Sequence, residues 1–192
     1  MKSAILIVLV LVLLPAVSVA ELIITEVYYD HPGLDSDAEW VEILNTGPDP
    51  VDLAGYQLCN AGTSYTWSVN VLSGTVGACA TFVVGGPYTD ADNFSPVYDL
   101  VLNFTPDFQN SGSASDAVAL FAPGVDPATG CPLSAVIYGG PNSNDLHDAS
   151  CSVGSPMVDD APHGQAIERV EHPLETWVVN ETPAPHGAGF TC

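Results

Sequence analysis

Proline and glycine interrupt this chain too often for long helices to form. The 192 residues include 16 prolines and 17 glycines, and both residue types destabilise helix interiors. The apolar segments between them are short and rich in β-branched and aromatic residues, which favour strands. Nine such segments predict strands: 22–29, 40–44, 56–59, 65–69, 81–84, 100–104, 117–121, 135–138 and 166–170. This spacing predicts an all-β fold, either a sandwich or a barrel.

The first twenty residues predict a secretory signal peptide. Lys2 supplies a positive charge, residues 5–14 are an unbroken apolar run, and Ser18 and Ala20 are small residues at a cleavage site. The run is shorter than the roughly 20 residues that span a bilayer, and no later segment is apolar enough to do so. We therefore expect cleavage after Ala20, one mature domain over residues 21–192, and a location in the periplasm or outside the cell.

The chain is strongly acidic. It carries 23 acidic and two basic residues, for a net charge of −21. Nucleic acid and anionic membrane surfaces are excluded as partners, because both are bound through Lys and Arg. Three interpretations of the acidity stay open: adaptation to saline surroundings, where salt screens repulsion, Ca²⁺ binding, or simple solubility of a secreted protein.

The five cysteines predict disulfides, since a signal peptide implies an oxidising compartment. None forms a Cys-x-x-Cys pair, which argues against zinc. Proximity favours Cys59–Cys79 and Cys131–Cys151, each closing a loop of about 20 residues, although the order of the cysteines does not fix the connectivity. Cys192 is left over and is either free or able to link two chains into a dimer.

Two glutamates fall among apolar residues of predicted strands. Strand alternation predicts these shared faces: Leu22, Ile24, Glu26 and Tyr28 in one strand, and Trp40, Glu42 and Leu44 in the next. A buried carboxylate requires a partner, and Arg169 is the single Lys or Arg after the signal peptide. We expect Arg169 to form a structural ion pair with Glu42 or Glu26; the alternative is that both carboxylates reach solvent at a sheet edge.

Six short motifs follow one another along the chain: residues 23–27 (IITEV), 39–45 (EWVEILN), 52–56 (DLAGY), 116–120 (DAVAL), 164–170 (GQAIERV), and Trp177 with 182–187 (TPAPHG). Together and in this order they resemble the lamin-tail domain family, in its secreted bacterial form. The resemblance implies an immunoglobulin-like β-sandwich. It also implies a secreted, non-enzymatic binding or structural module that requires no cofactor and whose partner is an extracellular protein or polysaccharide. Residues 93–109 and 142–163 match no motif of the family.

The acidic loop over residues 30–39 is a candidate calcium site. Asp35, Asp37 and Glu39 alternate along the chain and Asp30 precedes a turn. Carboxylate oxygens are the ligands that Ca²⁺ prefers, but the loop does not match the EF-hand pattern. The second hypothesis is therefore a calcium-dependent carbohydrate- or protein-binding module. The alternative for these residues is an ordinary solvated turn.

A third hypothesis is a small secreted hydrolase. His147 and His163 lie near several aspartates in the polar segment 142–163, and they would have to converge in one cleft to act as an acid–base pair. The chain has neither a metalloprotease His-Glu-x-x-His motif nor a Gly-x-Ser-x-Gly nucleophile turn. Solvated loop histidines are the favoured interpretation, and we predict that the protein is not an enzyme.

Overall fold

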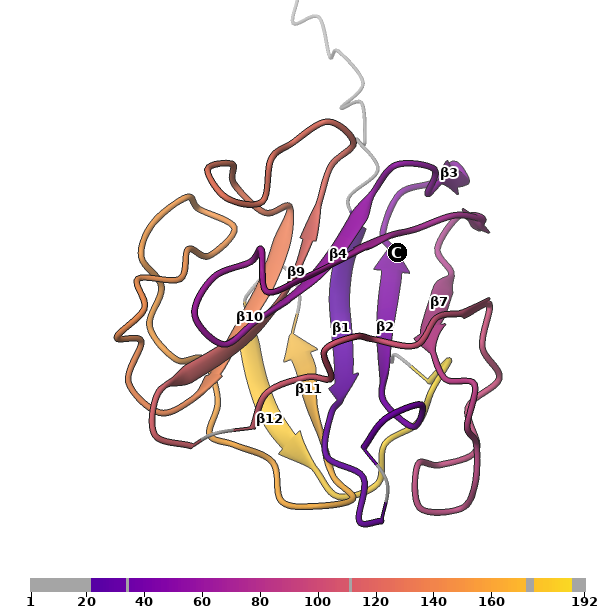
Figure 1. Cartoon of the computed structure of the whole chain (residues 1–192). Helices are drawn as coiled ribbons and strands as arrows, with labels where there is room; N and C mark the ends of the chain where they lie inside the picture. Colours follow the sequence, from indigo (N-terminus) through magenta and orange to yellow (C-terminus); the bar gives the residue numbers. More distant parts are fainter. Residues whose placement is uncertain (1–21, 34, 111, 172–174, 188–192) are drawn as a thin grey trace, which may run out of the picture.

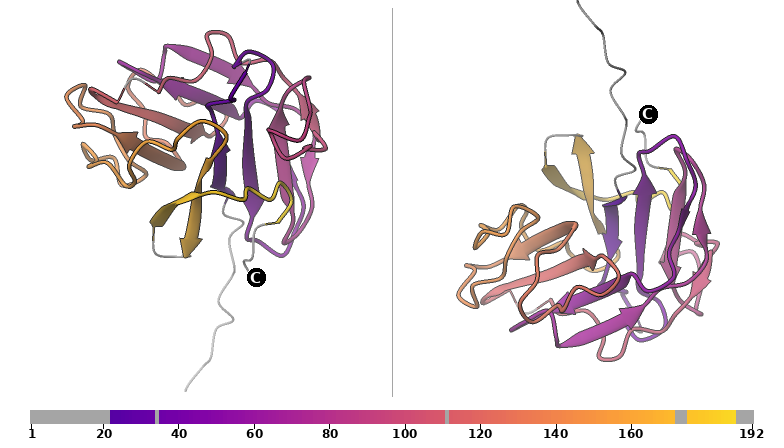
Figure 2. Two further views of the ribbon diagram at one scale, coloured as in Figure 1. Left: turned by 90° about the horizontal axis from the view of Figure 1, so that it is seen from below. Right: turned by 90° about the horizontal axis from the view of Figure 1, so that it is seen from above.

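Two β-sheets pack face to face and form a sandwich (Figures 1 and 2). The structure is a computed structural model that describes residues 22–187 except 34, 111 and 172–174. Within these residues it has twelve strands and no helix, so no described helix is long and apolar enough to cross a membrane. The expected all-β, immunoglobulin-like sandwich is confirmed.

The larger sheet has six strands and the smaller has four. In spatial order, the larger contains β12 (Thr176–Asn180), β11 (Ala166–Glu171), β1 (Leu22–Tyr28), β2 (Trp40–Asn45), β7 (Thr81–Gly85) and β8 (Leu100–Val101). The smaller contains β10 (Ser134–Gly139), β9 (Ser115–Phe121), β4 (Gln57–Ala61) and β5 (Ser68–Val71). A separate pair joins β3 (Val51–Asp52) to β6 (Thr75–Val76). Each of the nine predicted segments overlaps a strand, whereas β3, β6 and β12 were not predicted.

The main core lies between the two sheets. It contains Ile24, Val41 and Ile43 from the larger sheet and Leu58 and Val118 from the smaller one, all fully buried. The outer faces are also partly covered. The loops after β9 and β10 cover β4, β9 and β10 of the smaller sheet, and this second cluster contains Cys59, Ala61, Tyr65, Ala117, Ala119, Phe121, Ala135, Ile137 and Leu146. Figure 2 shows these loops on the side of the small sheet that faces away from β1 and β2.

A β-bulge changes the predicted faces of β1. The pairing register with β2 shifts between Ile24 and Glu26, and a bulge inserts one extra residue into a strand. Ile24 and Val27 therefore both point into the main core. The prediction that Ile24 and Glu26 share a face is wrong, because Glu26 and Tyr28 lie on the outer face of the larger sheet.

Candidate functional site

The acidic loop begins and ends in buried carboxylates. Asp30 follows β1 and is 6% exposed, and Glu39 precedes β2 and is 2% exposed, whereas Asp35 is exposed and Asp37 is half-buried. Among the described residues, one group of three acidic or histidine side chains brings its ligand atoms within 4.8 Å of one another. None of these four residues belongs to that group. The loop is therefore not a preassembled cage for an ion, and calcium binding stays a prediction.

Glu39 carries the most perturbed carboxyl group of this region. Both of its carboxylate oxygens accept the backbone N–H of Phe108, at 2.9 and 3.1 Å. Burial raises the pKa of Glu39 to about 9, and repulsion from Asp107, Asp35 and Asp30 adds to the rise. Asp107, in the loop between β8 and β9, thus joins the acidic loop. No spacing in the sequence links position 107 to this loop, so sequence reasoning missed it.

His163 contacts the acidic loop, and His147 lies elsewhere. His163 Nδ1 is 2.7 Å from Asp30 Oδ1; burial raises the pKa of Asp30, and His163 opposes that rise. The backbone oxygen of His147 instead accepts the Tyr65 hydroxyl at 2.7 Å. The two histidines have different partners, so the acid–base cluster required of a hydrolase has no support in the described contacts.

A second polar cluster, not anticipated from the sequence, joins His31 to Asp90 and Asp92. His31 Nδ1 accepts the N–H of Gly33 at 3.1 Å, so the proton of the neutral ring is on Nε2, which lies 3.3 Å from Asp90 Oδ1. The same Oδ1 accepts the backbone N–H groups of Asp92 and Asn93. A metal ion at Nε2 would displace the proton that holds this network together. The cluster therefore fastens the loop after β7 to the loop after β1.

Glu26 and Glu42 are buried, but Arg169 is not their partner. Glu26 is 3% and Glu42 1% exposed. Glu26 lies opposite Glu168 in the register of β1 and β11, so the adjacent Arg169 points to the other face of the sheet. Arg169 instead places its guanidinium 3.8 Å from Glu175. The predicted ion pair is wrong, because strand alternation turns Arg169 away from both carboxylates.

Backbone N–H groups near the C-terminus bind these two carboxylates instead. Glu26 accepts the amide of Asn180 at 3.1 Å and the N–H of Ala184 at 3.4 Å. Glu42 accepts the N–H of His186 at 2.6 Å and the hydroxyl of Thr25 at 2.7 Å. These contacts fasten the segment after β12 across the outer face of β1 and β2.

Like charges crowd this pair. Burial, followed by repulsion from Glu168 and Glu42, raises the pKa of Glu26 to about 8. Burial also raises the pKa of Glu42, while its bonds to Thr25 and His186 oppose the rise. Glu26 therefore keeps its proton at neutral pH, and its interactions are those of a neutral carboxylic acid.

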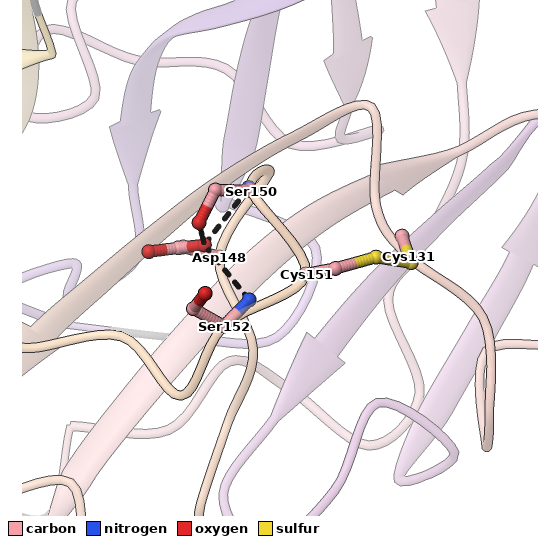
Figure 3. The surroundings of a disulfide bond; sticks show 5 residues. All are labelled: Cys131, Asp148, Ser150, Cys151 and Ser152. Carbon is pink, nitrogen blue, oxygen red and sulfur yellow. Dashed lines mark hydrogen bonds between the residues drawn. A yellow bond between two sulfur atoms is a disulfide. The ribbon is translucent and has the colours of Figure 1, made fainter.

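One of the two predicted disulfides is present. Cys131 and Cys151 are bonded (Figure 3), and they join the loops that cover the smaller sheet. Next to Cys151, Asp148 Oδ1 accepts the N–H and hydroxyl of Ser150, at 2.8 and 2.6 Å, and the N–H of Ser152 at 3.4 Å (Figure 3). These bonds hold the disulfide loop in a tight turn.

The predicted Cys59–Cys79 disulfide is wrong. Cys59 is a free, buried thiol on the outer face of the smaller sheet, where it packs in the cluster with Ala119. Cys79 is disulfide-bonded and lies beside the turn after β2, since its N–H donates to the oxygen of Gly47 at 3.1 Å. The two cysteines belong to regions on different sheets. Cys192 lies outside the described residues, so the dimer through it stays a prediction.

A shallow pocket opens where the β4–β5 turn meets the disulfide-linked loops. Its volume is about 150 Å³. Tyr65, Pro127, Asn144, Leu146 and His147 are among the residues that line it. The amide of Asn144 donates to the oxygen of Gly62 at 2.8 Å and fixes the turn against the loop. Ser64, Asp145 and His147 also line it. Among the described contacts no hydrogen bond or ion pair joins these three side chains, and the Ser64 hydroxyl bonds Thr66 at 2.8 Å instead, so the pocket shows no assembled catalytic group.

The edge strand β5 exposes a row of apolar side chains. Trp67, just before the strand, is 46% exposed, and Val69 and Val71 within it are 42% and 64% exposed. Val69 and Val71 alternate along the strand and share the outer face of the smaller sheet. Together with Trp67, in the turn before the strand, we call them the β5 row. Val69 pairs with Cys59 of β4, so the row continues the covered apolar cluster beyond the reach of its covering loops.

The model of the Lamin Tail Domain family matches residues 15–150 of the chain. The protein is a member of the lamin tail domain family. Domains of this family are non-enzymatic and immunoglobulin-like, in agreement with the sandwich described above. No curated protein and no solved structure matches the chain. In the lamin tail domain described here, β11 and β12 follow the matched residues yet complete the larger sheet beside β1.

Proposed function

We propose that this lamin tail domain protein is a secreted, non-enzymatic binding or structural module that contacts an extracellular partner through the edge at β5. The observation that carries the proposal is the β5 row. Contiguous apolar side chains left exposed on a soluble protein mark interaction surfaces, and an open sheet edge also offers unpaired backbone groups to a partner. The signal peptide expected over residues 1–20 and the disulfide between Cys131 and Cys151 support a place outside the cytoplasm.

The buried carboxylates support a structural rather than a catalytic role. Glu26, Glu39 and Glu42 all accept backbone N–H groups from distant segments, so their described contacts serve to fasten loops. A catalytic acid or base requires access to a substrate, and these three side chains are almost completely buried.

The proposal is tested by binding to whole cells of the producing organism. The full chain is expressed with its leader, and the mass of the exported protein is measured; loss of residues 1–20 is expected. The exported protein is then sedimented with cells. Wild type should sediment with them, Val71→Glu should not, and Val178→Glu, an equal charge on exposed Val178 of edge strand β12, should behave as wild type. Failure of export, or equal sedimentation of all three proteins, would contradict the proposal.

Calcium binding by the acidic loop is a second candidate, favoured by the approach of Asp107 to this loop. Repulsion from Asp35 and Asp37 adds to the burial that raises the pKa of Asp107, and a divalent cation would relieve this repulsion. Thermal unfolding in Ca²⁺, in chelator and in NaCl of matched ionic strength tests it. A calcium-specific rise in melting temperature that Asp35→Asn removes, and that the exposed control Glu181→Gln keeps, would support the site. Equal responses to Ca²⁺ and NaCl would show charge screening alone.

A further inference from the structure

The outward edge of β5 offers backbone groups that are free for pairing. Leu72 donates its N–H to the oxygen of Tyr56 at 2.8 Å, and hydrogen-bonded pairs alternate along an antiparallel ladder. Asn70 and Ser68 therefore also bond to β4, while the N–H and C=O groups of Val69 and Val71 point away from it. Within the described part of the chain, no backbone group of another segment bonds to them.

The segment that contains this edge has no charge. No Asp, Glu, Lys or Arg occurs from residue 53 to residue 89, although the whole chain has a net charge of −21. This charge-free segment forms β4, β5, β6 and β7. A positively charged partner would bind most favourably to the acidic surfaces outside this segment. An uncharged edge instead suits a partner that is as acidic as the protein itself, because like charges oppose close approach everywhere else.

The other three edges of the two main sheets are protected in the described chain. The segment around residue 158 covers β10, with Met157 donating to Ile137 at 2.7 Å and Gly139 donating to Val158 at 3.0 Å. β8 has two residues and follows Asp99. β12 lies between Glu175 and Glu181. Charge, short length and cover are the usual ways to protect a sheet edge from pairing. β5 has four residues, and it carries neither a charged side chain nor a covering segment among the described residues.

We propose that two copies of the protein pair through β5, antiparallel about a twofold axis, so that the two four-stranded sheets become one continuous sheet. This inference rests on the proposed binding role of the β5 edge and names its partner as a second copy of the chain. An isologous contact uses the same surface on both copies, so an edge that is uncharged on one copy meets an uncharged edge on the other.

The β5 row fits this pairing. If Val69 lies opposite Val69 of the second copy, the outward backbone groups of both strands meet in a hydrogen-bonded pair. In the same register Trp67 of each copy lies opposite Val71 of the other. Aromatic and β-branched side chains are favourable cross-strand neighbours. The exposed row of each copy is thus covered by the row of the other.

Sedimentation of the purified protein, without cells, tests the pairing over a wide range of concentration and at low and high NaCl. We expect a reversible shift from the mass of one chain to that of two. NaCl should strengthen the association, because salt screens the repulsion between the acidic bodies. A single-chain mass under every condition would overturn the proposal, as would an association that NaCl weakens.

Three variants separate edge pairing from general adhesion. Val71→Glu should weaken the dimer roughly tenfold or more, because the change places two like charges in one interface. Val69→Pro removes an outward N–H and leaves the bonds to β4, so it should weaken the dimer as well. Val178→Glu adds the same charge to the edge at β12 and should leave the dimer intact. Circular dichroism checks that each variant is folded, and an equal effect of Val178→Glu and Val71→Glu would overturn the proposal.

The cell-binding experiment and the sedimentation experiment can contradict the two proposals independently. A protein that is monomeric in solution but binds cells through Val71 would overturn self-pairing and leave the binding function standing. A protein that dimerises through Val71 but binds no cells would overturn the cell-surface partner and leave self-pairing standing.

Discussion

The two sheets of this lamin tail domain reverse the usual placement of charged and apolar side chains. The larger sheet buries carboxyl groups, with Glu26 and Glu42 on its outer face and Glu39 at the start of β2. The smaller sheet exposes Val69 and Val71 on its edge strand. In most proteins glutamate is almost never fully buried without a partner, whereas valine is among the most often buried residues.

The contacts explain the difference. Each buried carboxylate has a donor within the chain, and each donor comes from a segment distant in sequence, so the carboxylates fasten loops onto the sandwich. The exposed valines have no covering segment among the described residues. The larger sheet is thus completed by its own chain, and the smaller sheet presents an edge that a second chain could complete.

The largest expected effect on stability comes from removing the disulfide that holds the covering loops on the smaller sheet. Replacing Cys131 and Cys151 by serine removes a bridge between residues 20 positions apart, which should cost about 3 kcal/mol of unfolding free energy. The loops over the outer cluster should also loosen, so that this face becomes as open as β5. Chemical unfolding measures the first effect, and binding of a hydrophobic dye the second.

Cys59→Ala is the matched control for this prediction. It removes a buried thiol that forms no disulfide, so it should cost about 1 kcal/mol and leave the dye response unchanged. If Cys59→Ala and the double serine variant behaved alike, the disulfide would not be what holds the cover on the smaller sheet.

The next largest effect is a pH-dependent gain in unfolding free energy from Glu39→Gln. Folded Glu39 keeps its proton up to about pH 9, whereas the unfolded group loses it near 4.5. The wild type therefore loses stability as pH rises between these values, by at most about 1.4 kcal/mol per pH unit. Glutamine does not titrate and can still accept the Phe108 N–H. The variant should gain on the order of 2 kcal/mol at pH 8 and almost nothing at pH 4.

Denaturant unfolding at several pH values measures this gain. Glu181→Gln removes an exposed carboxyl group and should leave the pH profile of stability as it is in the wild type. A constant effect of Glu39→Gln from acid to alkaline pH would mean that Glu39 is ionised in the folded protein, as it would be beside a bound cation.

Glu26→Gln should also raise the unfolding free energy as pH rises, but by a smaller amount than Glu39→Gln. The pKa of Glu26 is raised to about 8 from 4.5, so the wild type loses stability over a narrower pH range. One of the two bonds from Asn180 and Ala184 is also lost when an amide replaces one oxygen. We expect a gain of about 1 kcal/mol at pH 8 in the same unfolding measurement. A loss of stability at pH 8 would show that the bond to the segment after β12 outweighs the repulsion.

Much of the fold follows from local sequence, since alternation and turn residues predicted nine of the strands. The faces of β1 did not follow, because a bulge between Ile24 and Glu26 depends on pairing with β2. The partners of the carboxylates did not follow either. Glu39, Glu26 and Glu42 are bound by backbone N–H groups of Phe108, Ala184 and His186, and a backbone donor leaves no residue type to search for.

The candidate sites show the same limit. The acidic loop was visible in the sequence, but Asp107 joins it through the fold alone. Proximity in sequence predicted Cys131–Cys151 correctly and paired Cys59 with Cys79 wrongly, because β4 and the turn before β7 belong to different sheets. The sequence alone shows that segment 53–89 has no charged residue, but the structure was needed to place this segment at a free sheet edge.

The smallest expected effect sharpens the contrast between an apolar residue inside the protein and one on the open edge. Val71→Thr exchanges a methyl group for a hydroxyl on a side chain that is 64% exposed, and the unfolding free energy of the monomer should change by less than about 0.5 kcal/mol. Val83→Thr makes the same exchange in β7, where the side chain is fully buried, and should cost roughly 1 to 3 kcal/mol because the hydroxyl is removed from water. Both are measured by denaturant unfolding of dilute protein, so that association does not contribute. A large loss for Val71→Thr under these conditions would mean that Val71 already packs within its own chain, and that its exposure is not what a second copy covers.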